Sequence, residues 1–223
     1  MGNSISAIVQ ARMASSRLPG KVMKKINGKP LIYYLLTRLE QSKYIQDIVV
    51  ATSTNKENDS LCDCIRDIGF SVVRGSEDDV LKRFVDASRV CSSDTLLRIT
   101  GDTPLIDPDI VDLLIEYFDE NNADYAYLSS DFAEGVDCEV ITNDALLFSD
   151  ENAIKESERE HVTLHIYGQG DQIKIVEMNN SQDHSKFRFT VDDEEDFQVV
   201  TSIIDHFKNQ YRTIRTADII EFL

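Results

Sequence analysis

The chain has 223 residues, of which 42% are hydrophobic and 28% charged, and its formal net charge is −17. These values predict one soluble α/β domain with a sizeable core. The strong negative charge argues against binding to nucleic acid or to an anionic membrane surface, whose phosphates would be repelled. The sequence has no apolar run near the ~18–20 residues of a membrane span, and its cysteines fit reduced thiols. We therefore expect a cytoplasmic protein without nucleic-acid or membrane partners.

The first predicted element is a buried strand over residues 7–9, which leads into a loop of small residues. That loop carries Arg12, Arg17 and Lys21. Small side chains let backbone N–H groups approach phosphate oxygens, and the three cations offset the charge of a polyphosphate. The spacing matches neither a Walker A loop nor a Rossmann fingerprint. The pattern favours a third kind of nucleotide loop, the alternative being an ordinary exposed basic loop.

Strand-like and helix-like segments then alternate along the chain, which is typical of a mostly parallel sheet covered by helices on both faces. The further predicted strands cover residues 48–51, 71–73, 96–99, 124–128, 173–177 and 187–191. The predicted helices cover residues 30–39, 58–69, 78–91, 156–167 and 194–207, and one more helix begins at Pro108 with Asp107 as its cap.

Polar residues follow several of the predicted strands, and ligands bind at the carboxyl ends of strands in sheets of this kind. The first strand leads to Arg12, the third to Arg74 and the fourth to Thr100 and Asp102. A carboxylate placed there suits Mg²⁺, which can bridge it to a triphosphate. From the residues alone, Asp102 is equally well interpreted as a cap of a turn or helix.

Two further groups of polar residues are weaker candidates. His161 and His165 lie four residues apart on a predicted helix and could share a zinc ion, but no third ligand is evident. A role in a substrate pocket or in packing fits them better. The acidic run 192–196 suits the cap and first turn of the last helix, where carboxylates complement the helix dipole. Of this run, only Asp192 is kept as a functional candidate.

Several motifs together resemble the SpsF-type cytidylyltransferases, which are named for spore-coat polysaccharide synthesis. These enzymes are similar to those that make CMP-sialic acid, CMP-pseudaminic acid and CMP-Kdo. The order and spacing of the motifs carry the resemblance over about residues 6–200. The motifs are VQARMASSRLPGK (9–21), RGSEDDVLKRF (74–84), RITGDTPLIDP (98–108), EGVDCEV (134–140), EREHVT (158–163) and TVDDEEDF (190–197).

The resemblance implies a single nucleotidyltransferase domain of GT-A-like architecture over residues 1–223. Its nucleotide-binding half would cover about residues 1–130, and its sugar-binding and dimerisation part about residues 131–223. The implied partners are CTP, a sugar acceptor of the acidic, nonulosonic type and a second copy in a homodimer. The implied product is a CMP-sugar for surface polysaccharide or glycan synthesis. Alternatives are another nucleoside triphosphate, a sugar phosphate as acceptor, or a non-catalytic module that binds nucleotide sugars.

The resemblance also assigns roles to individual residues. Arg12, Lys21, Asp102 and Asp192 form the implied catalytic set, in which Asp102 and Asp192 hold Mg²⁺. Nucleotide binding is implied for Ala11, Arg12, Arg17, Gly20, Lys21, Arg74 and Thr100. Acceptor binding is implied for Gly135, Asp137, Glu139 and His161. Because Asp137 and Glu139 alternate along a strand-like segment, both carboxylates can face one side, although ordinary salt bridges would explain them nearly as well.

Two departures from the family pattern concern the acceptor. Thr163-Leu164-His165 stands where many relatives have Thr-Pro-Tyr, and Gln10 stands where sialate and Kdo enzymes tend to have proline. The second departure favours the SpsF branch. In cytidylyl transfer a sugar alkoxide attacks the α-phosphorus in line, so positioning and charge neutralisation dominate. The general base stays open between Asp192 and a metal-bound hydroxyl.

Overall fold

The computed structural model describes residues 4–223, apart from the side chain of Asn209. Its strands are β1 (Ile5–Gln10), β2 (Lys25–Ile26), β3 (Lys29–Pro30), β4 (Ile45–Ser53), β5 (Ser71–Gly75), β6 (Thr95–Thr100), β7 (Tyr125–Leu128), β8 (Glu139–Thr142) and β9 (Ile175–Met178). Its α-helices are α1 (Leu31–Leu39), α2 (Asp59–Asp67), α3 (Val80–Ser88), α4 (Pro108–Asn121), α5 (Asn143–Asn152), α6 (Glu156–Glu160), α7 (Glu194–Phe207) and α8 (Thr216–Phe222).

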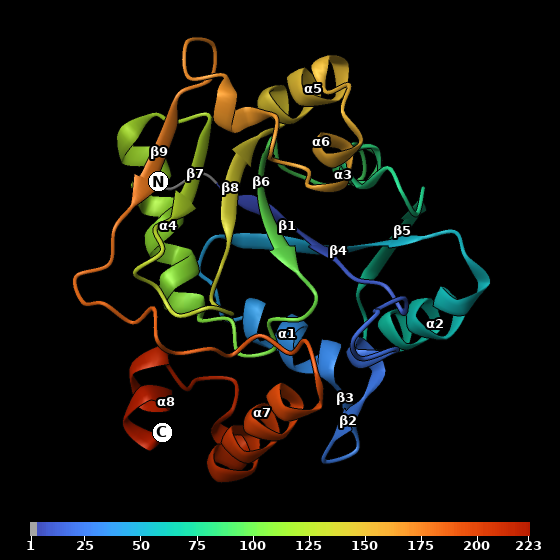
Figure 1. Ribbon diagram of the computed structural model, residues 1–223, viewed down its shortest axis with the longest axis vertical. Coiled ribbons are helices and arrows are strands. Elements are labelled where there is room, and N and C mark those ends of the chain that lie inside the picture. The colour runs from blue at the N-terminus through green and yellow to red at the C-terminus, as the bar shows by residue number, and fades with distance from the viewer. Residues whose placement is uncertain (1–3) are drawn as a thin grey trace.

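A seven-stranded sheet with the order β5-β4-β1-β6-β8-β7-β9 forms the centre of the molecule (Figure 1). Strand β8 is antiparallel to its neighbours β6 and β7, while the other neighbouring pairs in this sheet are parallel. The short strands β2 and β3 form a separate hairpin. The prediction of a mostly parallel sheet in one α/β domain is therefore confirmed.

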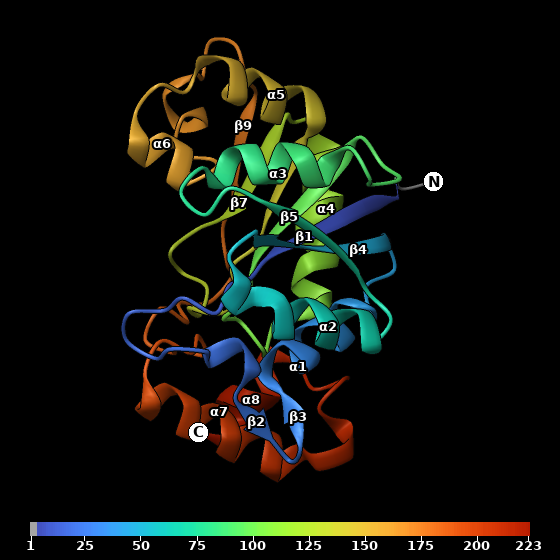
Figure 2. The ribbon, with the colours of Figure 1, turned by 90° about the vertical axis from the view of Figure 1, so that its right-hand side faces the viewer.

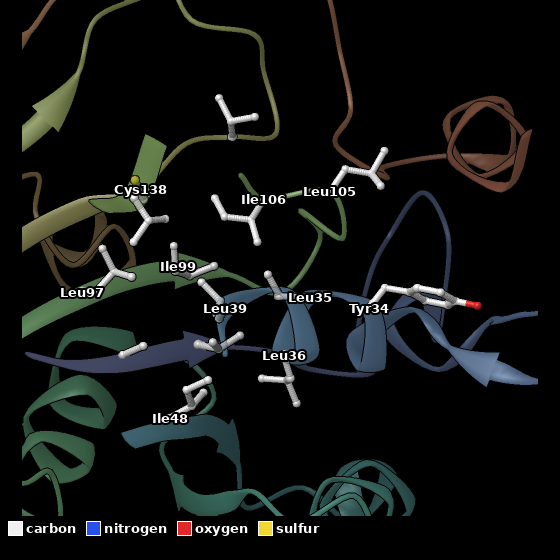
Figure 3. Close-up of a cluster of buried hydrophobic side chains, with 14 of the residues drawn as sticks. Tyr34, Leu35, Leu36, Leu39, Ile48, Leu97, Ile99, Leu105, Ile106 and Cys138 are labelled. Atoms are coloured by element: carbon white, nitrogen blue, oxygen red, sulfur yellow. The ribbon is translucent and has the colours of Figure 1, made fainter. Parts of the chain in front are cut away.

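Helices cover both faces of the sheet, as predicted, because successive side chains of a buried strand point to opposite faces. On β1, Ala7 and Val9 pack in the cluster formed with α1, α4, α7 and α8, whereas Ile8 packs in the cluster formed with α3 and α5. Figure 2 shows α3 on one side of the strands and α4 on the other. Figure 3 shows Leu35 and Leu39 of α1 packed in the first cluster with Ile99 of β6.

The elements with strong local signals agree well with the prediction. Helix α4 begins at Pro108, and the side chain of its cap, Asp107, accepts a hydrogen bond from the Asp109 N–H. Helix α7 has the predicted bounds, and Asp193 and Asp196 form a reciprocal capping box at its start. The acidic residues 193–196 thus serve as the cap and the first turn of α7, as predicted. In the described part of the chain, no helix is long and apolar enough to cross a membrane.

Two predicted elements were wrong. The helix expected over 156–167 ends at Glu160, and Val162 takes a φ of 28°. Burial of Val162, together with a hydrogen bond from Thr163 Oγ1 to Glu139, draws this segment onto the sheet and breaks the helix. The strand expected over 187–191 forms only a bridge, between Arg188 and Glu134, because its neighbour is a tight loop.

The segment after α7 is fixed to the domain by two buried side chains. Arg38 of α1, which has no exposed surface, donates hydrogen bonds to the carbonyl oxygens of Ile106 at 2.7 Å and Ile214 at 2.8 Å. Burial lowers the pKa of Arg38 to about 10, so the guanidinium stays charged at neutral pH. Asp107 accepts hydrogen bonds from the backbone N–H of Thr216 at 2.6 Å and from its hydroxyl at 2.8 Å. Together these contacts hold α8 against the start of α4.

We expect Arg38→Leu to lower the free energy of unfolding by about 3 kcal/mol, because it leaves buried carbonyl groups without donors. Urea denaturation followed by circular dichroism measures this loss. Arg66→Leu is the matched control, since Arg66 lies on the surface of α2 with 56% of its side chain exposed. That control should change stability by less than about 0.5 kcal/mol. Equal effects of the two substitutions would contradict the prediction.

Candidate active site

A cavity of about 540 Å³ opens where β1 and β6 end, within the size range of small-molecule sites. Its lining comes from the first loop, the end of β6, helix α3 and the approach to α7. The lining residues are Gln10, Ala11, Arg12, Ala14, Ser15, Ser16, Arg17, Lys21, Val22, Arg83, Thr100, Gly101, Asp102 and Asp192. The whole predicted catalytic set lies in this lining, together with most of the predicted nucleotide-binding residues.

The parallel pairing of β1 with β6 brings this site together. Gln10 pairs with Thr100, so both strands deliver their following loops to the same edge of the sheet. The N–H of Gly101 donates a 2.8 Å hydrogen bond to the Gln10 carbonyl. A Cβ atom on Gly101 would lie 2.8 Å from that oxygen and 2.9 Å from the Cβ of Ala11. Only glycine therefore lets the two loops approach this closely and places Asp102 over the cavity.

Lys21 is the centre of the polar contacts. Its Nζ lies 2.9 Å from Asp102 Oδ2 and 2.9 Å from Asp192 Oδ1, and only 11% of its side chain is exposed. Gly20 precedes it with a φ of 70°, a left-handed conformation that favours glycine. This turn directs Lys21 into the cavity. One ammonium group thus joins three segments that are far apart in the sequence.

Asp192 receives two further cations on its second carboxylate oxygen. Arg17 lies 2.8 Å and Arg188 2.7 Å from Asp192 Oδ2. Partial burial by itself raises the pKa of Asp192. The hydrogen bond and charge of Lys21, the charge of Arg17 and the hydrogen bond from Arg188 outweigh this effect and lower the pKa. The side chain of Asp196 accepts from the N–H of Asp192 at 2.8 Å. Sequence analysis missed Arg188, because nothing local connects it to the first loop.

Each of the three cations of the first loop is paired with a carboxylate. Arg17 and Lys21 contact Asp192, and Arg12 lies 2.7 Å from Glu77 in the loop between β5 and α3. Carboxylate oxygens therefore occupy contacts that phosphate oxygens can also make. This pairing explains how a strongly acidic chain holds a cationic loop in a fixed place.

Two residues of the cavity lining each carry a buried side-chain atom without a hydrogen-bond partner in the protein. These atoms are Gln10 Oε1 and Arg83 Nε, both among the unpaired buried side-chain atoms of the described residues. Arg83 is otherwise held through a 2.5 Å hydrogen bond to the Ser76 carbonyl. Buried polar atoms are rarely left unpaired in proteins. The charged side chains of the lining, among them Arg12, Lys21 and Asp102, suit the cavity to a polar ligand. Arg83 lies inside the RGSEDDVLKRF motif, but no role was predicted for it.

Arg74, predicted to bind the nucleotide, lies away from this cavity. Its guanidinium donates to the carbonyl oxygens of Ser53 at 3.0 Å and Asn55 at 2.9 Å, and pairs with Asp59 at 2.7 Å. These contacts brace the connection between β4 and α2. Arg74 is not among the residues that line the cavity.

The predicted acceptor residues Asp137 and Glu139 make contacts with other protein groups, and His161 is exposed. Asp137 is exposed and accepts a hydrogen bond from the Gly135 N–H at 2.8 Å. Glu139 begins β8 and pairs with Arg98 at 2.9 Å, while His161 is exposed at the end of α6. The expectation that Asp137 and Glu139 alternate along one strand was wrong, because Asp137 precedes that strand.

Gly135 has a structural reason to be glycine. Its φ is 102°, and a Cβ atom there would lie 2.5 Å from the backbone nitrogen of Thr190. The chain around Gly135 is thus pressed against the segment before Asp192, where the Phe189 N–H donates to the Glu134 carbonyl at 2.7 Å. This contact fixes the path of the backbone toward the cavity.

Asp102 and Asp192 are the side chains in this cavity that could hold a divalent metal. His165 lies 3.7 Å from Glu158, and no cluster of three or more His, Cys, Asp or Glu residues able to hold a metal occurs among the described residues. Asp102 and Asp192 converge on one point through one oxygen each. Mg²⁺ is commonly bound by one or two carboxylates together with substrate phosphates and water. The two carboxylates fit that ion.

Comparisons with known proteins agree with the resemblance noted in the sequence. The family model described as cytidylyltransferase matches residues 6–217. The spore coat polysaccharide biosynthesis protein SpsF of Bacillus subtilis is 34% identical over 210 residues, which are 90% of this chain and 86% of that protein.

Two solved structures are also similar to this chain. A cytidylyltransferase from Leptospira borgpetersenii superposes with a TM-score of 0.92 at 32% identity, covering 99% of this chain and 93% of that one. A CMP:2-keto-3-deoxy-manno-octonic acid synthetase complexed with CTP shares the fold at a TM-score of 0.71 and 17% identity, covering 92% and 99% of the two chains. The chain thus belongs to the cytidylyltransferase family and is a nucleotidyltransferase.

Proposed function

We propose that this enzyme transfers the cytidylyl group of CTP to a sugar of the acidic, nonulosonic type, with release of pyrophosphate. The product would be a CMP-sugar for surface polysaccharide or glycan synthesis. The observation that carries this proposal is the convergence of Lys21, Asp102 and Asp192 in a cavity lined also by Arg12 and Arg17. Cations for phosphates and paired carboxylates for a divalent metal are what nucleotidyl transfer requires.

In the proposed mechanism Arg12, Arg17 and Lys21 bind the triphosphate and neutralise the pyrophosphate as it leaves. Asp102 and Asp192 would hold Mg²⁺, which when bound offsets negative charge on the reacting phosphate. Gly101 lets the loops after β1 and β6 lie against each other at the edge of the sheet. The loop positions are fixed before substrate arrives, so little reorganisation is needed during the reaction.

For the acceptor we propose the region around Gly135, Asp137, Glu139 and His161, as the resemblance implies. Glu139 pairs across the sheet with Arg98, which is two residues before the cavity-lining Thr100. This places Glu139 next to the end of β6. The relative complexed with CTP is named for an acidic sugar, which supports a sugar of that class here. We also propose a cytoplasmic homodimer, as in the family that the sequence resembles.

Pyrophosphate release, measured against a panel of nucleoside triphosphates and sugars, tests this function directly. We expect activity with CTP and an acidic nonulosonic sugar in the presence of Mg²⁺. Preference for another nucleoside triphosphate or for a sugar phosphate would overturn the substrate assignment. Binding of nucleotide sugars without any turnover would indicate a non-catalytic module.

Lys21→Ala should lower kcat/KM by ~10²–10³, because it removes one preorganised charge from the phosphate site. Steady-state kinetics with CTP as the varied substrate measures the loss. Lys24→Ala serves as the control, since Lys24 is three residues further on, pairs with Glu194 and lies outside the cavity lining. Wild-type kcat/KM in the Lys21 variant would remove Lys21 from the phosphate site.

Asp102→Asn should abolish Mg²⁺-dependent turnover while leaving the fold intact, because the amide keeps the shape of the side chain and loses its charge. Activity is followed across a Mg²⁺ titration, and the fold by circular dichroism. Asp63→Asn, at a site on α2 with 75% of its side chain exposed, controls for loss of a carboxylate elsewhere. An unchanged Mg²⁺ dependence in the Asp102 variant would contradict the metal assignment.

A further inference from the structure

The position of Lys21 is unusual for a residue whose proposed partner is a triphosphate. Its ammonium lies between the two carboxylates assigned to the metal, at 2.9 Å from Asp102 Oδ2 and 2.9 Å from Asp192 Oδ1. These side chains are largely buried, with exposed fractions of 11% for Lys21, 24% for Asp102 and 14% for Asp192. One small cationic group thus occupies the point on which the two oxygens converge.

A divalent cation cannot share that point with the ammonium. Mg²⁺ binds carboxylate oxygens at about 2.0–2.1 Å, whereas the ammonium already contacts the same two oxygens from between them. Repulsion between Mg²⁺ and a lysine charge at such short range would also be large in a partly buried site. Either Lys21 or the metal is therefore bound by this pair of oxygens at one time.

We infer that the ammonium of Lys21 occupies the metal position between Asp102 and Asp192 until the nucleotide binds. In this position it holds the two carboxylates in place for the metal and excludes the metal itself. This inference rests on the proposed function. Without a cation, two largely buried carboxylates facing one another would repel, and the metal site would open. With Lys21 in place the site is held in shape. A triphosphate offers Lys21 another partner and frees both oxygens.

The remaining contacts of Asp192 support such an exchange. Arg17 and Arg188 lie nearest to its Oδ2, at 2.8 Å and 2.7 Å, whereas Lys21 lies nearest to its Oδ1, at 2.9 Å. Asp192 can therefore exchange its partner on Oδ1 while its other oxygen stays fixed. The consequence is positive coupling, in which nucleotide and metal each raise the affinity of the other.

Electron paramagnetic resonance of free Mn²⁺, used as a probe of the metal site, tests this role without any turnover. For wild-type enzyme we expect weak Mn²⁺ binding alone and tight binding with CTP. Lys21→Met and Lys21→Gln should bind Mn²⁺ without nucleotide at least ~10-fold more tightly than wild type, because the competing charge is gone. Lys21→Arg, which keeps the charge, and Lys24→Met, which lies outside the site, should bind Mn²⁺ as weakly as wild type.

The sign of the effect separates this role from a merely structural one. If Lys21 only maintained the fold, its loss would weaken Mn²⁺ binding. Unchanged or weaker Mn²⁺ binding in a folded Lys21→Gln variant, as judged by circular dichroism, would overturn the inference. Adding Asp102→Asn to that variant should remove the gained affinity. Failure of the proposed function would show differently, as no turnover of CTP with any sugar of the panel while Lys21→Gln still gains Mn²⁺ affinity in the absence of nucleotide.

Discussion

The ion pairs of Lys21 with Asp102 and Asp192 are the interaction on which the site depends. The lysine comes from the first loop, one carboxylate from the end of β6 and the other from the segment before α7. Packing alone would leave two carboxylates facing each other in a largely buried place, which is costly. The ammonium of Lys21 offsets that repulsion together with the two arginines at Asp192. It also connects the first loop to the segment before α7 and lies at the centre of the polar contacts in the cavity.

Close backbone contacts make this arrangement possible. Gly101 lets the loops after β1 and β6 touch, and Gly135 lets the chain before β8 press against the segment that leads to Asp192. Arg38 and Asp107 hold the segment from 211 to 216 and thereby α8. The site is therefore built on the rigid edge of the sheet, where catalytic groups can be held in a fixed geometry.

The net charge of the chain and the charges in the cavity have opposite effects on the binding of an anion. A net charge of −17 indicates repulsion of polyanions. In the cavity, however, Arg12, Arg17 and Lys21 are each paired with an acidic side chain. Under the proposed function, a triphosphate would replace these carboxylates at cations that are already positioned. An acidic enzyme can bind a highly charged substrate in this way without a large basic surface.

Helices with strong periodicity and caps, such as α4 after Asp107 and α7, could be predicted from the residues alone, because these signals are local. The same holds for the place of Asp102 and of the first loop at strand ends, and parallel strands share an edge, so these two groups were expected to meet. The pairing of Arg188 with Asp192, the contacts of Arg74 beside α2 and the end of α6 at Glu160 became visible only in the folded chain. The physical reason is that these outcomes depend on contacts between distant segments, which override local propensity and leave no periodic signal.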